Sequence, residues 1–121
     1  MISERCEKAF AALNSDGMPL VVDAVVHANE YDKLHPASFR ALNLLDAISD
    51  PYTDALMVIT YAGRDEFSEG HPYGEMEIGT QFREWWECLN MEHEHYAREV
   101  MAEKLPLGKY LRNGAYMFRI G

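Results

Sequence analysis

The residues with the clearest potential for chemistry are the alternating carboxylates and imidazoles of Glu92-His-Glu-His95. Glu92 and His95 are three residues apart, and His95 and Glu99 are four apart, so on a helix either pair would share one face. Glutamate and imidazole at this spacing serve as ligands in di-iron bundles and in zinc sites. The segment therefore contains the residue types of a metal site on a helix.

The sequence lacks the remainder of such a site. A di-iron centre needs a second Glu-x-x-His, and the nearest counterpart, Asp32-x-x-His35, lies directly before a proline. A zinc site needs further ligands, and the spacing of His71 and Cys88 does not favour either residue. We therefore expect no metal and no cofactor. We interpret the segment as a solvated helix face with a His–Glu pair at i, i+4.

Nucleophilic and phosphate-binding motifs are missing as well. The chain has no phosphate-binding loop, no Gly-x-Ser-x-Gly and no His-Glu-x-x-His. Cys88 lies one helical turn from Glu84 and Glu92, an unfavourable setting for a thiolate. We expect no catalytic residues. A small metal-dependent or acid–base enzyme that uses the Glu92–Glu99 region and His71 stays open as an alternative.

The first half of the chain has the patterns of helices. Capping residues, apolar spacing and prolines predict helices over Ser3–Asn14, from His35-Pro36 to Ser49, and from Asp50-Pro51 to Tyr61 or Ala62. Residues 19–27 are rich in valine, which is typical of strands, but Pro19 at a first helical position favours a helix. We favour the helix for this segment.

The second half predicts a loop, one long helix and a hairpin. Residues 63–79 are rich in glycine and acidic residues and predict a loop with a short strand at Glu75–Ile78. Apolar residues at helical spacing predict a helix from Thr80 to about Lys104. Asn113-Gly114 between two apolar arms is a strong hairpin signal. The expected fold is therefore α+β: one domain over residues 1–121, dominated by four to five helices, with a small C-terminal β-hairpin. An all-α bundle is the alternative.

Charge is the most informative part of the composition. The chain of 121 residues has a net charge of −9, which disfavours direct binding to nucleic acid or to anionic membranes. Segment 65–103 holds eleven acidic residues against two basic ones. No apolar run is long enough to span a membrane, and the N-terminus lacks the pattern of a signal peptide. With only two cysteines, the expected location is the cytoplasm.

The pair Trp85-Trp86 indicates a binding surface. Neighbouring helical residues point about 100° apart, so both tryptophans cannot occupy the centre of one apolar stripe. We expect Trp85 in the core and Trp86 at its edge, as the apolar anchor of a partner-binding site. Its charged contacts would be Glu87, Glu94, Glu66, Glu69 and Glu75. The alternative is that another element of the fold covers Trp86.

These features predict a non-enzymatic acidic binding protein. Its expected partner is a protein with a basic surface, such as a nucleic-acid-handling complex, which it would inhibit by direct occlusion. In size, charge and lack of catalytic motifs, the chain is similar to phage and mobile-element inhibitors of bacterial defence, anti-CRISPR proteins above all. That likeness involves no specific residues. An antitoxin or an assembly subunit is a further alternative, and the sequence leaves the oligomeric state open.

Overall fold

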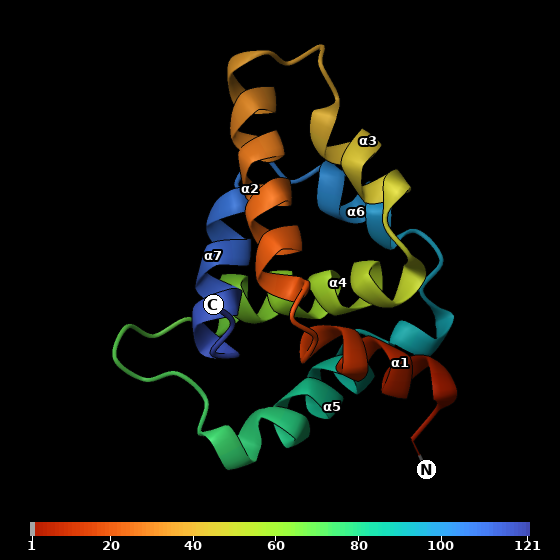
Figure 1. Cartoon of the computed structure of the whole chain (residues 1–121), viewed down its shortest axis with the longest axis vertical. Helices are drawn as coiled ribbons and strands as arrows, with labels where there is room; N and C mark the ends of the chain where they lie inside the picture. Colours follow the sequence, from red (N-terminus) through yellow and green to blue (C-terminus); the bar gives the residue numbers. More distant parts are fainter. Residues whose placement is uncertain (1) are drawn as a thin grey trace.

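The computed structural model describes residues 2–121, and the regular elements in this part of the chain are all helices (Figure 1). It contains seven α-helices, two short 3₁₀ helices and no β-strand. The elements are α1 (Glu4–Leu13), α2 (Met18–Leu34), α3 (Arg40–Ala47), α4 (Asp50–Asp65), η1 (Glu75–Glu77), α5 (Ile78–Cys88), η2 (Met91–His93), α6 (Ala97–Ala102) and α7 (Leu107–Met117). The predicted α+β class with four to five helices is therefore wrong, and the all-α alternative fits.

Helix α4 is the central element of the core. Every residue from Thr53 to Thr60 is buried, so this helix is apolar on nearly all sides rather than along one stripe. Helices α1, α5, α6 and α7 all pack against it. Figure 1 shows α4 crossing the middle of the molecule, with α5 at one end and the turn between α2 and α3 at the other.

The predicted C-terminal hairpin is wrong because Asn113-Gly114 lies inside helix α7. Gly114 does not form a turn there. A Cβ atom at this position would lie 1.8 Å from the carbonyl oxygen of Ile59 on α4. Gly63 on α4 has the same role, because its Cβ would lie 1.9 Å from the carbonyl oxygen of Tyr110. The two glycines let the backbones of α4 and α7 approach closely. The Asn-Gly pattern alone does not tell whether a glycine is needed for a turn or for such a close approach.

The predicted helix from Thr80 to Lys104 is interrupted after Cys88. Asn90 has a left-handed backbone with φ of 53°, a conformation that asparagine tolerates better than most residues. The chain then continues through η2 and an extended residue, Glu94, into α6. Glu92, His95 and Glu99 consequently do not share one helical face.

Three smaller predictions have different outcomes. Residues 19–27 are helical within α2, as we favoured. The helix expected from His35-Pro36 begins only at Arg40, because the Asp32 carboxylate accepts hydrogen bonds from the amides of Arg40 and Ala41, both at 2.8 Å. The strand expected at Glu75–Ile78 is wrong, since η1 and the start of α5 occupy this segment.

Buried side chains from α1, α2, α4, α5, α6 and α7 join in one hydrophobic core. Within residues 2–121, no single helix has the length and composition to cross a membrane. By length and composition alone, only α1 and α2 together meet that test, as a pair bent by 84°.

Candidate functional site: the acidic face of helix α5

Trp86, the expected apolar anchor, is buried. Only 4% of its surface is exposed, and its ring stacks on Phe82 with 5.9 Å between the centroids. Its ring nitrogen donates a hydrogen bond to Glu92 at 2.5 Å. Both tryptophans therefore belong to the core, and the structure agrees with the alternative in which another element covers Trp86.

Glu92 has a structural role beneath the N-terminus of α1. Its carboxylate accepts hydrogen bonds from the Ser3 hydroxyl and from the Trp86 ring nitrogen, and these bonds lower its pKa. Ser3 in turn caps α1 by accepting a hydrogen bond from the amide of Cys6. Within residues 2–121, no three His, Cys, Asp or Glu side chains converge in a way that could hold a metal ion.

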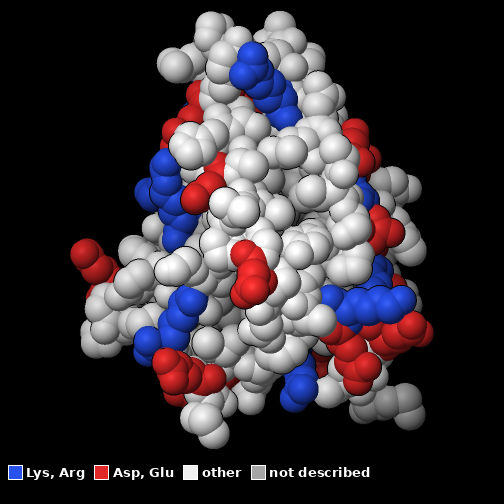
Figure 2. Space-filling view, in the orientation of Figure 1, with Lys and Arg blue, Asp and Glu red and all other residues white. Residues whose placement is uncertain are grey.

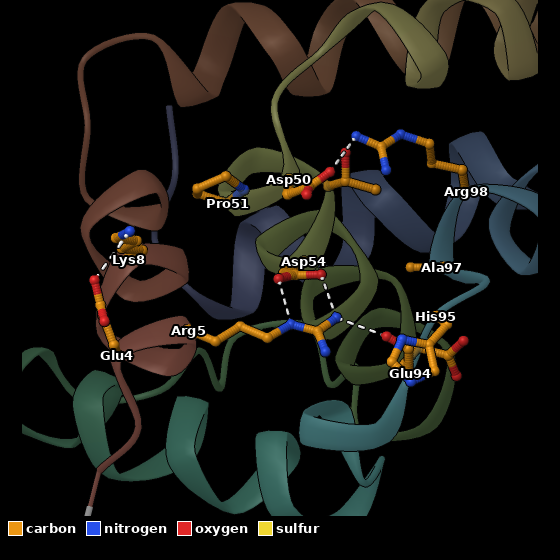
Figure 3. Close-up of a pocket in the computed structure, with 11 residues that line it drawn as sticks. Glu4, Arg5, Lys8, Asp50, Pro51, Asp54, Glu94, His95, Ala97 and Arg98 are labelled. Carbon is orange, nitrogen blue, oxygen red and sulfur yellow. Dashed lines mark hydrogen bonds and ion pairs between the residues drawn. The ribbon is translucent and has the colours of Figure 1, made fainter.

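A polar groove of about 600 Å³ lies between α1, the start of α4 and residues 94–98 (Figure 3). The Arg5 guanidinium forms its floor. It donates two hydrogen bonds to Asp54, at 2.9 and 3.0 Å, and a third to the carbonyl of Glu94 at 2.8 Å. The bond to Asp54 raises the pKa of Arg5. Asp54 is almost fully buried, so this bidentate pair ties α1 to α4.

The other two cations of the groove are engaged in the same way. Arg98 donates to the carbonyls at the end of α3 and to the carboxylate of Asp50, each at 2.8 Å. Lys8 pairs with Glu4 at 3.1 Å. Glu94, one of the predicted contacts, lies in this groove half-buried and accepts a hydrogen bond from the amide of Tyr96. Each of the groove's three cations therefore has a carboxylate partner, and the two arginines hold helices together, whereas the Lys8–Glu4 pair lies within α1.

A second feature is the solvent side of α5. This helix buries Phe82, Trp85 and Trp86 on its inner side, which leaves the opposite side free for charged residues. Six exposed carboxylates lie on α5, η1 and the preceding loop, and we call them the acidic face: Glu66, Glu69, Glu75, Glu77, Glu84 and Glu87. Four of them are among the predicted contacts, and Glu77 and Glu84 are additions.

Helix geometry explains why the three glutamates at the start of and within α5 share one side. Glu77, Glu84 and Glu87 are separated by seven and three residues, close to whole helical turns. Arg83 is the only Lys or Arg between Asp65 and Cys88. Figure 2 shows that elsewhere acidic and basic side chains lie interspersed on the face displayed there. The segment that carries the acidic face has one basic residue of its own, and Arg119 near the C-terminus lies beside it, donating to the carbonyl of Tyr73 at 2.6 Å.

A small slot lies within the acidic face. It has a volume of about 190 Å³ and is lined by Glu66, Gln81, Glu84, Trp85 and Cys88. The Tyr73 hydroxyl accepts a hydrogen bond from the Trp85 ring nitrogen at 3.1 Å and donates one to Glu66 at 2.8 Å. Burial raises the pKa of Tyr73, so it stays a neutral donor. Glu66 is thereby held beside the edge of the indole ring.

Met76 is an exposed apolar residue beside the acidic face that the sequence analysis did not single out. Its surface is 96% exposed, and it stands between Glu75 and Glu77. The helical spacing directed attention to the tryptophans because large aromatic residues dominate binding hot spots. A methionine between two glutamates, directly before the helix that Trp85 anchors, was the signal available in the sequence.

No protein-family model matches this chain, and neither the curated proteins nor the solved structures include one that is significantly similar to it. The function is therefore inferred from the residues and contacts described above.

Proposed function

We propose that this protein is a non-enzymatic binding protein whose acidic face docks onto a basic surface of a protein partner. The observation that carries the proposal is the concentration of exposed carboxylates on the well-anchored helix α5 and on the η1 and loop residues that precede it. Within residues 2–121, five of the six glutamates of the acidic face form no ion pair or side-chain hydrogen bond. The sixth, Glu66, is oriented by Tyr73.

The slot favours a lysine or arginine side chain of the partner. Such a side chain can lay its aliphatic part against the Trp85 ring and place its charge between Glu66 and Glu84. Tyr73 already holds Glu66 in position, so little ordering is required when the partner binds. Met76 supplies a flexible apolar contact at the edge of the same surface.

Occlusion is the function that such a surface supports best. A groove that binds nucleic acid presents cations spaced to meet phosphates, and a row of carboxylates can compete for those cations. We propose a nucleic-acid-handling protein as the partner and the cytoplasm as the location, the setting of an anti-CRISPR-like inhibitor of bacterial defence. An antitoxin or an assembly subunit would use the same surface.

No observation favours the enzyme alternative. Glu92 is engaged by Ser3 and Trp86, and His71 lies exposed in the loop before α5. We therefore assign no catalytic role to the Glu92–Glu99 region or to His71.

Affinity capture from a nuclease-treated bacterial lysate tests the proposal. The tagged protein is washed at low and at high salt, and retained proteins are identified by mass spectrometry. We expect retention of one basic, nucleic-acid-processing protein or complex, weakened at high salt because the contacts are ionic. Retention of acidic proteins alone, or retention that does not depend on salt, contradicts the proposal.

A further inference from the structure

The end of the molecule opposite α5 carries lysines and exposed apolar side chains instead of a cluster of carboxylates. A hollow of about 160 Å³ lies where the turn between α2 and α3 meets the connection between α6 and α7. We call it the distal hollow; it is lined mainly by Lys33, Pro36, Phe39, Ala102, Lys104 and Leu105. Phe39 is 61% exposed and Leu105 is 72% exposed. Two large apolar side chains thus stand in solvent beside two lysines.

The backbone of Phe39 is held in an unfavourable conformation. Its backbone is left-handed, with φ of 53°, which is unfavourable for a bulky aromatic residue. Asp32 holds the turn around it, because its carboxylate accepts hydrogen bonds from the Ser38 hydroxyl and from the amides of Arg40 and Ala41. A strained residue that gains almost no burial in the isolated chain is typical of a binding site.

The charge of the distal hollow is positive. Lys33 and Lys104 have no ion-pair partner within residues 2–121, and Lys104 lies 4.8 Å above the ring of Tyr61. Asp32 is the only carboxylate lining the hollow, and donors of the protein itself already saturate it. These hydrogen bonds outweigh the effect of burial and lower the pKa of Asp32. The hollow therefore has two lysines without an ion pair against one hydrogen-bonded carboxylate, on a molecule with a net charge of −9.

Size and polarity indicate what fits. A cavity of about 150 Å³ can hold one benzene molecule, so the hollow has room for a single side chain such as leucine or phenylalanine. The polar groups at its base are satisfied, because Asn29 donates to the carbonyl of Lys104 and accepts from the amide of Gly108. An apolar side chain can therefore enter without leaving a polar group of the hollow unpaired.

We infer that the distal hollow binds an acidic amphipathic segment of a protein partner. One apolar side chain of that segment fills the space between Phe39 and Leu105, and its carboxylates meet Lys33 and Lys104. Nucleic acid, an anionic bilayer or a second copy of the chain extends beyond the hollow and would meet the acidic remainder of a molecule with a net charge of −9, whereas a short segment contacts this end alone. Charge complementarity at this end therefore favours a protein segment, and the inference does not depend on the acidic face.

The test is a titration of the isotope-labelled full chain, monitored by ¹⁵N–¹H correlation spectra. The probe is a peptide of about 16 residues with leucine along one helical face and glutamate elsewhere. Two control peptides replace every glutamate by lysine or every leucine by alanine. We expect shifts confined to the amides of residues 33–40 and 102–106, a loss of binding as salt rises, and no comparable shifts with either control.

Variants of the protein make the test specific. Lys33→Glu should weaken binding about tenfold, whereas Lys109→Glu, the same charge change at an exposed lysine of α7, should change it less than about twofold. Phe39→Gly removes the aromatic side chain while glycine accepts the left-handed backbone, and it should abolish the shifts.

Four results would overturn the inference. The first is the absence of shifts at about 2 mM peptide, a concentration that detects even weak affinity, and the second is shifts centred on other residues. The third is that the lysine peptide binds as well as the glutamate peptide. The fourth is that Lys33→Glu and Lys109→Glu weaken binding equally. Because recognition is proposed to depend on charge and one apolar side chain, a peptide of this composition must bind. Binding to phosphatidylserine vesicles, or concentration-dependent shifts of the same amides without peptide, would assign the hollow to a membrane or to a second copy instead.

Discussion

At the residue scale, Phe39 has a strained backbone and little buried surface, so a substitution there tests the effect of backbone strain on stability almost alone. Since its side chain is mostly exposed and its φ is 53°, replacement by glycine removes strain and little apolar contact. We expect Phe39→Gly to leave the free energy of unfolding unchanged or raise it by up to about 1 kcal/mol, as measured by urea denaturation. Tyr96→Gly is the control, because Tyr96 is equally exposed with an ordinary φ of −126°. It should destabilise the protein by about 0.5–1 kcal/mol. A Phe39→Gly protein less stable than Tyr96→Gly would contradict this view.

Asp32 gives a pH dependence with a defined sign. Its pKa is lowered in the folded protein because the bonds from Ser38, Ala41 and Arg40 outweigh burial. Its contribution is therefore complete above the unfolded-state value of about 3.9 and is lost as the pH falls through the lower folded value. At neutral pH, Asp32→Ala should cost about 1 kcal/mol, as for a helix cap. The difference from the wild type should shrink below about pH 4 in acid titrations of stability. A difference that is constant down to pH 2 would argue against the assignment.

The burial of Trp86 could not be predicted from the residues around it in the sequence. The sequence indicates that two adjacent tryptophans cannot share the centre of one stripe, and this is correct as helix geometry. Whether the second one is covered depends on α1, which lies more than seventy positions earlier in the chain and packs against α5. Local spacing contains no information about that contact. The surrounding glutamates at 66, 69, 75 and 87 are exposed as predicted, because surface charge requires no tertiary partner.

At the element scale, prolines and capping residues made the helices of the first half predictable, apart from the start of α3, and the later helices were not predictable. Helical spacing continues across the break at Asn90, because Trp85 and Leu89 before it and Tyr96 and Val100 after it fall on one stripe, so spacing alone predicts one helix. Asn113-Gly114 has the composition of a turn, but Gly114 is required by the close crossing of α4 and α7. Both errors have one cause. The local sequence pattern is compatible with more than one structure, and contacts within the folded molecule select among them.

The α4–α7 crossing predicts a large difference between two glycines. Gly114→Ala forces a Cβ to within 1.8 Å of the Ile59 carbonyl oxygen, so the helices must separate. We expect a loss of about 3 kcal/mol or more in the free energy of unfolding. Gly79→Ala is the matched control inside α5, where the new Cβ meets only Phe10 at 3.6 Å. It should stabilise the protein by up to about 1 kcal/mol. Similar effects at both sites, measured by chemical denaturation, would refute the close crossing.

At the scale of the whole molecule, the two candidate surfaces lie at opposite ends of the longest axis (Figure 1). The acidic face is at the α5 end and the distal hollow is at the turn between α2 and α3. In the polar groove between them each of the three cations has a carboxylate partner, and Arg5 joins α1 to α4 and to the carbonyl of Glu94. This arrangement allows partners of opposite charge to bind without competing for the same residues.

The acidic face is the central claim, and charge reversal within it is the most direct measurement. Glu84→Lys together with Glu87→Lys changes two exposed carboxylates of α5, and Asp23→Lys together with Asp46→Lys makes the same change in net charge on α2 and α3. Both variants should keep their stability within about 0.5 kcal/mol, as expected at exposed sites. In capture experiments at matched salt, we predict that the α5 variant loses the basic partner while the wild type and the α2–α3 variant retain it. Equal retention by all three proteins, or equal loss by both variants, would contradict the account.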